Sequence, residues 1–228
     1  MPKIFGVKVD QITLVQAVEQ VEAWLKTSKK HYIVTPNPEI IMLAQTDEGF
    51  RKILNQADMA IPDGVGLRLA VPGLKRVSGT DLMLELIKRG HKTVLAGAQP
   101  GVAQKAADRL RSLLVGTPTR CDLFKRSDLF SMSEPDITAI NRLHPDLLFV
   151  ALGQSKQEKW IVKNLPKLKV KVAMGVGGAL NQIAKPWLRA PKFIRQIGLE
   201  WLYRLIVQPW RIKRQLVLVK FAWNVLTT

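Results

Sequence analysis

The chain has 228 residues, of which 47% are hydrophobic, so it can bury a sizeable core, and a disordered chain is excluded. Its formal net charge of +17 calls for an anionic partner: nucleic acid, an acidic membrane surface or a phosphate-bearing substrate. The single cysteine, Cys121, excludes an intramolecular disulfide framework and fits a reducing cytoplasm. The start of the chain has no apolar leader-like region and no apolar run of about 18 residues occurs, so we expect neither a signal peptide nor a membrane-spanning helix.

Strand and helix patterns alternate along the chain as far as residue 184. In chain order, the predicted strands are 4–9, 31–34, 59–62, 93–96, 119–124, 147–152 and 170–176. The predicted helices between them are 13–26, 38–45, 47–55, 63–70, 80–88, 101–114, 134–143 (capped by Ser133), 154–165 and 178–184. This alternation, with a wholly apolar strand at 147–152, predicts an α/β, Rossmann-like fold with a parallel sheet between helices.

Polar side chains follow two of the predicted strands. Asp63 and a pair of glycines follow strand 59–62, and Thr35 and Asn37 follow strand 31–34. In open α/β sheets, ligands bind outside the carboxyl ends of the strands. A carboxylate held there can deprotonate a hydroxyl, as sugar transfer requires, although Asp63 can equally be an N-cap. For Thr35 and Asn37, ordinary turn chemistry is the alternative.

Three further segments lie near the starts of predicted helices. Arg76 stands just before a helix start, where a guanidinium can hold phosphate oxygens, the alternative being a solvated surface arginine. Gln157 lies in the segment 152–158, which opens the helix after the buried strand. The turn Gly175-Val176-Gly177-Gly178 is a weak phosphate loop, because it fits neither the Walker pattern nor a complete G-x-G-x-x-G.

Several catalytic patterns are absent from the sequence. No D-x-D motif is present, and His31, His91 and His144 lack metal-ligand spacing. A G-x-S-x-G nucleophile elbow is missing as well. We therefore expect no metal and no cofactor.

The α/β alternation ends near Lys185-Pro186, so we expect a core at 1–188 and a helical appendage at 189–228. Beyond residue 188 the only acid is Glu200, and aromatic residues are interleaved with basic ones. The basic residues are Arg189, Lys192, Arg195, Arg204, Arg211, Lys213, Arg214 and Lys220. This composition is typical of a helix that lies on an anionic membrane surface, the alternative being a helix packed on the core.

Taken together, these segments resemble the WecG/TagA/CpsF family of bacterial glycosyltransferases along nearly the whole chain. The residues that carry the resemblance are Thr35-Pro36-Asn37-Pro38-Glu39, Asp63-Gly64-Val65-Gly66, Arg76-Val77-Ser78-Gly79-Thr80-Asp81, 152–158, 175–178, Arg189-Ala190-Pro191, 198–205 and 209–214. Each piece is weak alone, but their ordered set is specific.

The resemblance implies an inverting, metal-independent transferase on the inner face of the cell membrane. It would move a sugar, often of the N-acetylmannosamine type, from UDP to a polyprenyl-diphosphate-linked sugar during cell-surface polysaccharide or teichoic-acid-like polymer synthesis. By the same resemblance, Asp63 would be the general base, and Thr35 and Asn37 would line the acceptor and donor pocket. Arg76 and Gln157 would meet the donor, and Arg204, Arg211 and Arg214 would close over the diphosphate.

The chain departs from the family pattern in two places. Leu180-Asn181 stands where the family usually has Phe-Asp, so Asn181 replaces a carboxylate expected at the donor uridine or ribose. The stretch 63–76 is also shorter than expected, which predicts a trimmed helix. An inactive or re-purposed paralogue is therefore an alternative.

Two alternative functions belong to other classes of protein. The net charge suggests a nucleic-acid binder, but no helix-turn-helix, zinc-finger or RNP signature is present, so we expect no nucleic acid. A nucleotide-binding oxidoreductase would need the complete G-x-G-x-x-G that is missing. The expected partners are a UDP-sugar, a lipid-linked sugar and an anionic membrane, with a homo-oligomer left open.

Overall fold

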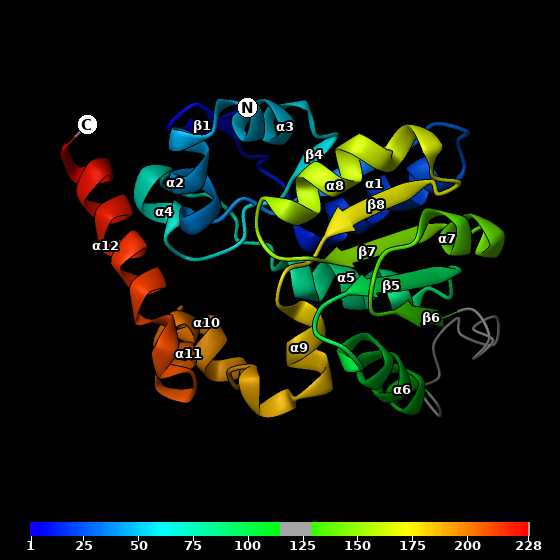
Figure 1. Ribbon diagram of the computed structural model, residues 1–228. Helices are drawn as coiled ribbons and strands as arrows, with labels where there is room; N and C mark the ends of the chain where they lie inside the picture. The colour runs from blue at the N-terminus through cyan, green and yellow to red at the C-terminus, as the bar shows by residue number, and fades with distance from the viewer. Residues whose placement is uncertain (115–128, 228) are drawn as a thin grey trace.

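A computed structural model describes residues 1–114 and 129–227, without the side chains of Arg211, Lys213, Arg214 and Gln215. Its centre is a six-stranded parallel sheet in the order β4-β3-β8-β7-β5-β6 (Figure 1). The strands are β3 (His31–Val34), β4 (Met59–Ala60), β5 (Thr93–Gly97), β6 (Leu129–Met132), β7 (Leu147–Ala151) and β8 (Val172–Gly175). The predicted α/β, Rossmann-like parallel sheet is confirmed.

Helices cover both faces of the sheet, as apolar side chains on both faces of its strands require. One face packs on α1 (Leu14–Leu25), α5 (Gly79–Lys88), α6 (Val102–Leu114) and α9 (Ala179–Ala184). The other packs on α2 (Pro38–Thr46), α3 (Glu48–Gln56), α7 (Ile137–Leu143) and α8 (Lys156–Asn164). Strand β7 shows the alternation: Leu147 and Phe149 enter the first cluster, and Leu148 and Val150 the second.

The helices begin where the sequence provides N-caps. Thr13 forms a capping box with Gln16 at the start of α1, and Asn37 accepts a hydrogen bond from the backbone N–H of Ile40 at the start of α2. Ser78 caps α5 in the same way. Helix α7 begins later than predicted, because Asp136 and not Ser133 is its cap.

The prediction of a single strand at 4–9 is wrong. Two short strands, β1 (Lys3–Ile4) and β2 (Val7–Lys8), pair antiparallel outside the main sheet. Phe5 and Gly6 connect the two strands, and both have positive φ, which reverses the direction of the chain. Strand β6 was not predicted, and the predicted strand 119–124 lies outside the described residues.

The segment after Asp63 is short, as the length of 63–76 predicts. Helix α4 (Leu67–Ala70) is a single turn that begins four residues after Asp63, within the segment 63–70 that was predicted to lead into a helix. Short 3₁₀ turns also occur elsewhere, at η3 (Leu165–Lys167), η4 (Pro186–Leu188) and η5 (Pro209–Arg211).

The C-terminal segment folds back over the carboxyl edge of the sheet. It comprises α10 (Lys192–Gln196), α11 (Glu200–Val207) and α12 (Ile212–Thr227), and α12 runs beside α2 and α4 (Figure 1). Phe221 of α12 is fully buried, with its ring edge-on to Phe5 at a centroid distance of 5.7 Å. None of the described helices is long and apolar enough to cross a membrane.

Candidate active site

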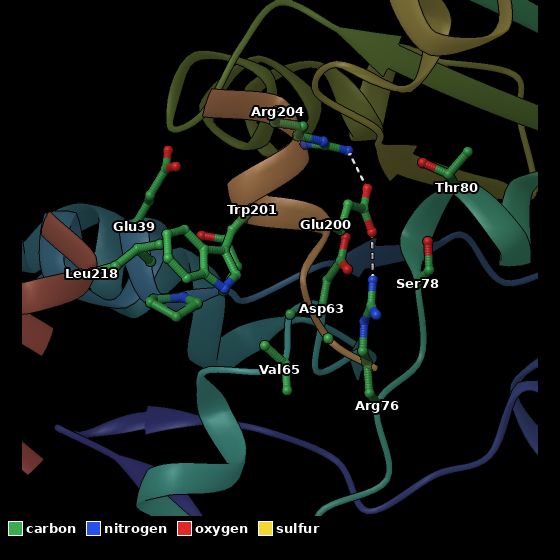
Figure 2. A pocket seen from close by; sticks show the side chains of 14 residues that line it. Glu39, Asp63, Val65, Arg76, Ser78, Thr80, Glu200, Trp201, Arg204 and Leu218 are labelled. Atoms are coloured by element: carbon green, nitrogen blue, oxygen red, sulfur yellow. Dashed lines mark hydrogen bonds and ion pairs between the residues drawn. The ribbon is translucent and has the colours of Figure 1, made fainter. Parts of the chain in front are cut away.

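A cleft of about 140 Å³ lies between the carboxyl edge of the sheet and the C-terminal segment (Figure 2). The turns after β3 and β4 supply Asn37 and Asp63, and the approach to α5 supplies Arg76. The opposite wall is α11, with Glu200 and Arg204. Residues far apart in the sequence therefore meet at the edge of the sheet where open α/β folds bind their ligands.

Asp63 lies at the bottom of this cleft. Its backbone N–H donates to the carbonyl of Pro36 at 2.9 Å, and its Oδ2 accepts only a long bond, 3.4 Å, from the N–H of Gly79. It does not cap α4, whose N-cap is Gly66 without a side-chain bond. The N-cap alternative for the helix that follows Asp63 is thus wrong.

Burial raises the pKa of the Asp63 carboxyl. The guanidinium of Arg76 opposes this rise, while the nearby carboxylate of Glu200 adds to it. A carboxylate with a raised pKa is a stronger base than a solvated aspartate, which suits it to accept a proton from a hydroxyl.

Glu200 joins two arginines across the cleft. Its Oε2 accepts from Nη2 of Arg76 and its Oε1 from Nη2 of Arg204, both at 2.7 Å, as the dashed lines in Figure 2 show. Burial alone would raise the pKa of Glu200, but Arg204 and Arg76 outweigh it and hold that pKa below the usual value. Glu200 is therefore ionised and fixes both guanidinium groups beside Asp63.

Sequence reasoning missed Glu200 as a site residue. Its one signal was being the sole acid in a strongly basic segment. Its contact with Arg76 spans 124 residues, and no local pattern encodes such a distance. A second carboxylate, Asp81, binds Arg189 and Arg195 and attaches the C-terminal segment to α5.

The remaining predicted site residues lie in different surroundings. Asn37 lines the cleft while its Oδ1 caps α2. Thr35 is buried beneath the cleft, where a Cβ on Gly79 would lie 2.8 Å from its Cγ2, so α5 can approach only with glycine at that position. The side chains of Arg211 and Arg214 lie outside the described part of the chain.

Two predicted donor contacts are not in the lining of this cleft. Gln157 is 1% exposed at the start of α8 and is bonded within the protein. Asn181 lies in α9, half-buried. Within the described residues, no group of three or more His, Cys, Asp and Glu side chains has the arrangement of a metal site.

Comparison with known proteins places this architecture. The model of the glycosyl transferase WecG/TagA/CpsF family matches residues 2–228. An N-acetylglucosaminyldiphosphoundecaprenol N-acetyl-beta-D-mannosaminyltransferase of Staphylococcus aureus strain MRSA252 is 33% identical over 222 residues, covering 92% of this chain and 86% of that protein. Proteins of the same name from strains NCTC 8325 / PS 47 and COL are 32% identical over the same shares. The chain therefore belongs to the WecG/TagA/CpsF family and is a glycosyltransferase.

Proposed function

We propose that this enzyme transfers an N-acetylhexosamine of the N-acetylmannosamine type from a UDP-sugar to a polyprenyl-diphosphate-linked sugar. The product would enter a cell-surface polysaccharide or a teichoic-acid-like polymer. The names of the relatives support the sugar and the lipid-linked acceptor. The observation that carries the proposal is the partly buried carboxyl of Asp63, which shares one cleft with Arg76 and Arg204.

In the proposed reaction, the Asp63 carboxylate takes the proton from an acceptor hydroxyl. The oxygen forms a bond to the anomeric carbon of the donor as the bond from that carbon to UDP breaks, and UDP leaves with the electron pair. Attack from the side opposite the leaving group inverts the configuration at the anomeric carbon. A base held at a strand end contributes because its position needs no adjustment during the reaction.

The two arginines suit the charge that develops on the departing UDP. Arg76 and Arg204 each donate one Nη to Glu200, and the buried Nε of each has no partner among the described residues. Buried donors without a partner beside a cleft favour an anionic ligand, because a buried N–H group that makes no hydrogen bond costs free energy. We propose that phosphate oxygens of the donor take up these donors.

The direct test is a screen of UDP-sugars for UDP release, with a short-chain polyprenyl-diphosphate-linked N-acetylglucosamine as acceptor. UDP-N-acetylmannosamine is expected to give acceptor-dependent release, and activity is expected to persist in excess chelator, because the proposed reaction uses no metal. Release that depends on added Mg²⁺ or Mn²⁺ would contradict the metal-free reaction. An enzyme inert toward every UDP-sugar would favour the re-purposed paralogue.

Replacing Glu200 by glutamine is expected to move the acid limb of the pH–rate profile to lower pH. Burial and the Glu200 charge both raise the pKa of Asp63, so removing that charge lets Asp63 ionise at lower pH. Arg76 and Arg204, which no longer face a carboxylate at position 200, also lower the pKa of Asp63. The measurement is kcat/KM against pH for the wild type and the variant. A shift of the acid limb to higher pH would contradict the assignment of this limb to Asp63.

The C-terminal segment has an unpartnered apolar stripe that supports membrane contact. Five side chains of α12 recur at helical spacing and are each more than half exposed: Ile212, Leu216, Val219, Trp223 and Leu226. The opposite face of α12 buries Phe221 against the core. An exposed apolar stripe in a segment with eight basic residues and one acid fits the surface of an anionic bilayer. We propose that residues 189–228 hold the enzyme peripherally on the cytoplasmic leaflet.

The double variant Leu216→Ser, Trp223→Ser is expected to weaken binding to phosphatidylglycerol vesicles by at least about tenfold, because each large apolar side chain contributes about 1.5–3 kcal/mol when buried. The matched control is Leu113→Ser, which removes a similarly exposed leucine from α6. Vesicle flotation measures both, and wild-type binding is expected to fall with salt. A stable dimer joined through the stripe, with no affinity for vesicles, would contradict the proposal.

A further inference from the structure

The dipeptide Gln157-Glu158 at the start of α8 is buried in an unusual way. Both side chains are 1% exposed, although they belong to residue types that are mostly found at the surface. Nε2 of Gln157 donates to Oε1 of Glu158 at 2.7 Å, and Oε1 of Gln157 accepts from the N–H of Gly177 at 2.9 Å. The amide of Gln157 thus joins the carboxyl of Glu158 to the glycine turn after β8.

The end of β8 is shaped to admit this amide. A Cβ on Gly175 would lie 2.7 Å from Nε2 of Gln157, closer than real Cβ contacts allow, and 3.0 Å from its Cδ, which is also tight. Glycine at 175 therefore gives the glutamine side chain its place, and the turn that follows is held by the bond to Gly177. The glycine-rich turn is thus held by a side chain of the protein itself, through the bond from Gly177 to Gln157.

The strand that leads into this turn is in contact with the residues that support Asp63. Strand β8 pairs directly with β3, with Met174 opposite Ile33. A Cβ on Gly79 would lie 3.3 Å from Cε of Met174, and the N–H of Gly79 points to Oδ2 of Asp63. Close packing therefore runs from α8 through the end of β8 to the start of α5. A shift at the turn would pass into the wall of the cleft, since close-packed interiors transmit displacement.

Burying the carboxyl of Glu158 costs free energy that a residue serving only to fill space would not require. Its Oε2 is buried without a hydrogen-bond partner among the described residues, and burial raises the pKa of its carboxyl. An apolar side chain of similar size would avoid this desolvation. A buried polar group with an unmade bond calls for a role beyond packing.

We infer that Glu158 is a positioning residue that acts through Gln157 to hold the turn 175–178 beside the donor. This inference rests on the proposed function and adds one step to it: the turn follows β8 at the carboxyl edge of the sheet, next to β3, where it would border the sugar nucleotide. Gln157 then supports donor binding from behind the cleft, without touching the UDP-sugar itself.

The test compares Gln157→Leu, Glu158→Leu and Glu158→Gln with an exposed control, Gln20→Leu on α1. Loss of the Gln157 acceptor is expected to speed amide hydrogen exchange at Gly177 by about tenfold, the worth of one hydrogen bond. The same change is expected to raise the KM for the UDP-sugar by about tenfold with a smaller change in kcat, because the donor site and not the base is displaced. Glu158→Leu is expected to do the same more weakly.

Glu158→Gln is the rescue variant, because its side-chain oxygen can still accept from Gln157. It is expected to keep wild-type exchange at Gly177 and wild-type KM, as is the Gln20→Leu control. Unchanged exchange in Gln157→Leu, or faster exchange with an unchanged KM, overturns the inference. If Gln157→Leu fails to fold, the Glu158→Leu and Glu158→Gln pair decides by the same two measurements. If the wild type transfers no sugar, the proposed function fails, while Gly177 exchange still shows whether Gln157 holds the turn.

Discussion

Asp63→Asn is expected to lower kcat by about 10²–10⁴-fold while the protein stays folded. Asparagine keeps the shape of the side chain but cannot accept the proton of the acceptor hydroxyl. This corresponds to roughly 3–5 kcal/mol of transition-state stabilisation. The matched control is Asp108→Asn, which alters an exposed aspartate of α6 and is expected to leave kcat unchanged. Turnover close to wild type in Asp63→Asn would remove Asp63 as the base.

The same variant carries a stability signature. Burial raises the folded-state pKa of Asp63 above its unfolded value, so ionisation of this carboxyl disfavours the folded state as pH rises through that interval. The asparagine variant avoids this cost. Its Tm is therefore expected to equal or exceed that of the wild type at neutral pH, with the difference vanishing in acid. A variant that loses stability at neutral pH would point to a structural carboxylate.

Arg76→Gln is expected to lower kcat/KM by about 10–10²-fold, because a hydrogen bond from a charged donor is worth about 1.5–3 kcal/mol. Glutamine can still donate to Glu200 but brings no charge to the leaving diphosphate. The control is Arg109→Gln, an exposed arginine of α6. The measurement is steady-state kinetics with UDP-sugar and lipid-linked acceptor. An effect no larger than that of the control would show that Arg76 only anchors the C-terminal segment.

The site residues that lie next to a predicted strand end or helix start could be predicted from the sequence. Asp63 and Asn37 each follow a predicted strand, Arg76 lies just before a predicted helix, and the structure brings all three to one cleft. The rule that parallel strands share a carboxyl edge is sufficient to bring Asp63 and Asn37 together. The hairpin at the N-terminus was not accessible, because the positive φ of Phe5 is unusual for its residue type.

Contacts between residues far apart in the chain could not be predicted from the sequence. The fixing of Arg76 by Glu200 depends on how α11 folds over the sheet, and the burial of Gln157 depends on the space left by Gly175. Charge counting also pointed to a nucleic-acid binder as a rival, and membership in a glycosyltransferase family overturns that non-enzymatic alternative. Residues 189–228 carry eight basic residues and one acid, and phosphate and lipid are the anions we propose for them.

The stereochemistry of the product tests the central claim most directly. The full chain would be incubated with UDP-N-acetylmannosamine and a polyprenyl-diphosphate-linked N-acetylglucosamine, and the anomeric configuration of the new linkage read from its one-bond carbon–proton coupling by NMR. Direct displacement assisted by Asp63 predicts a β-linked product from the α-linked donor, formed by the wild type and almost absent with Asp63→Asn. An α-linked product, or equal formation by both proteins, would contradict the account.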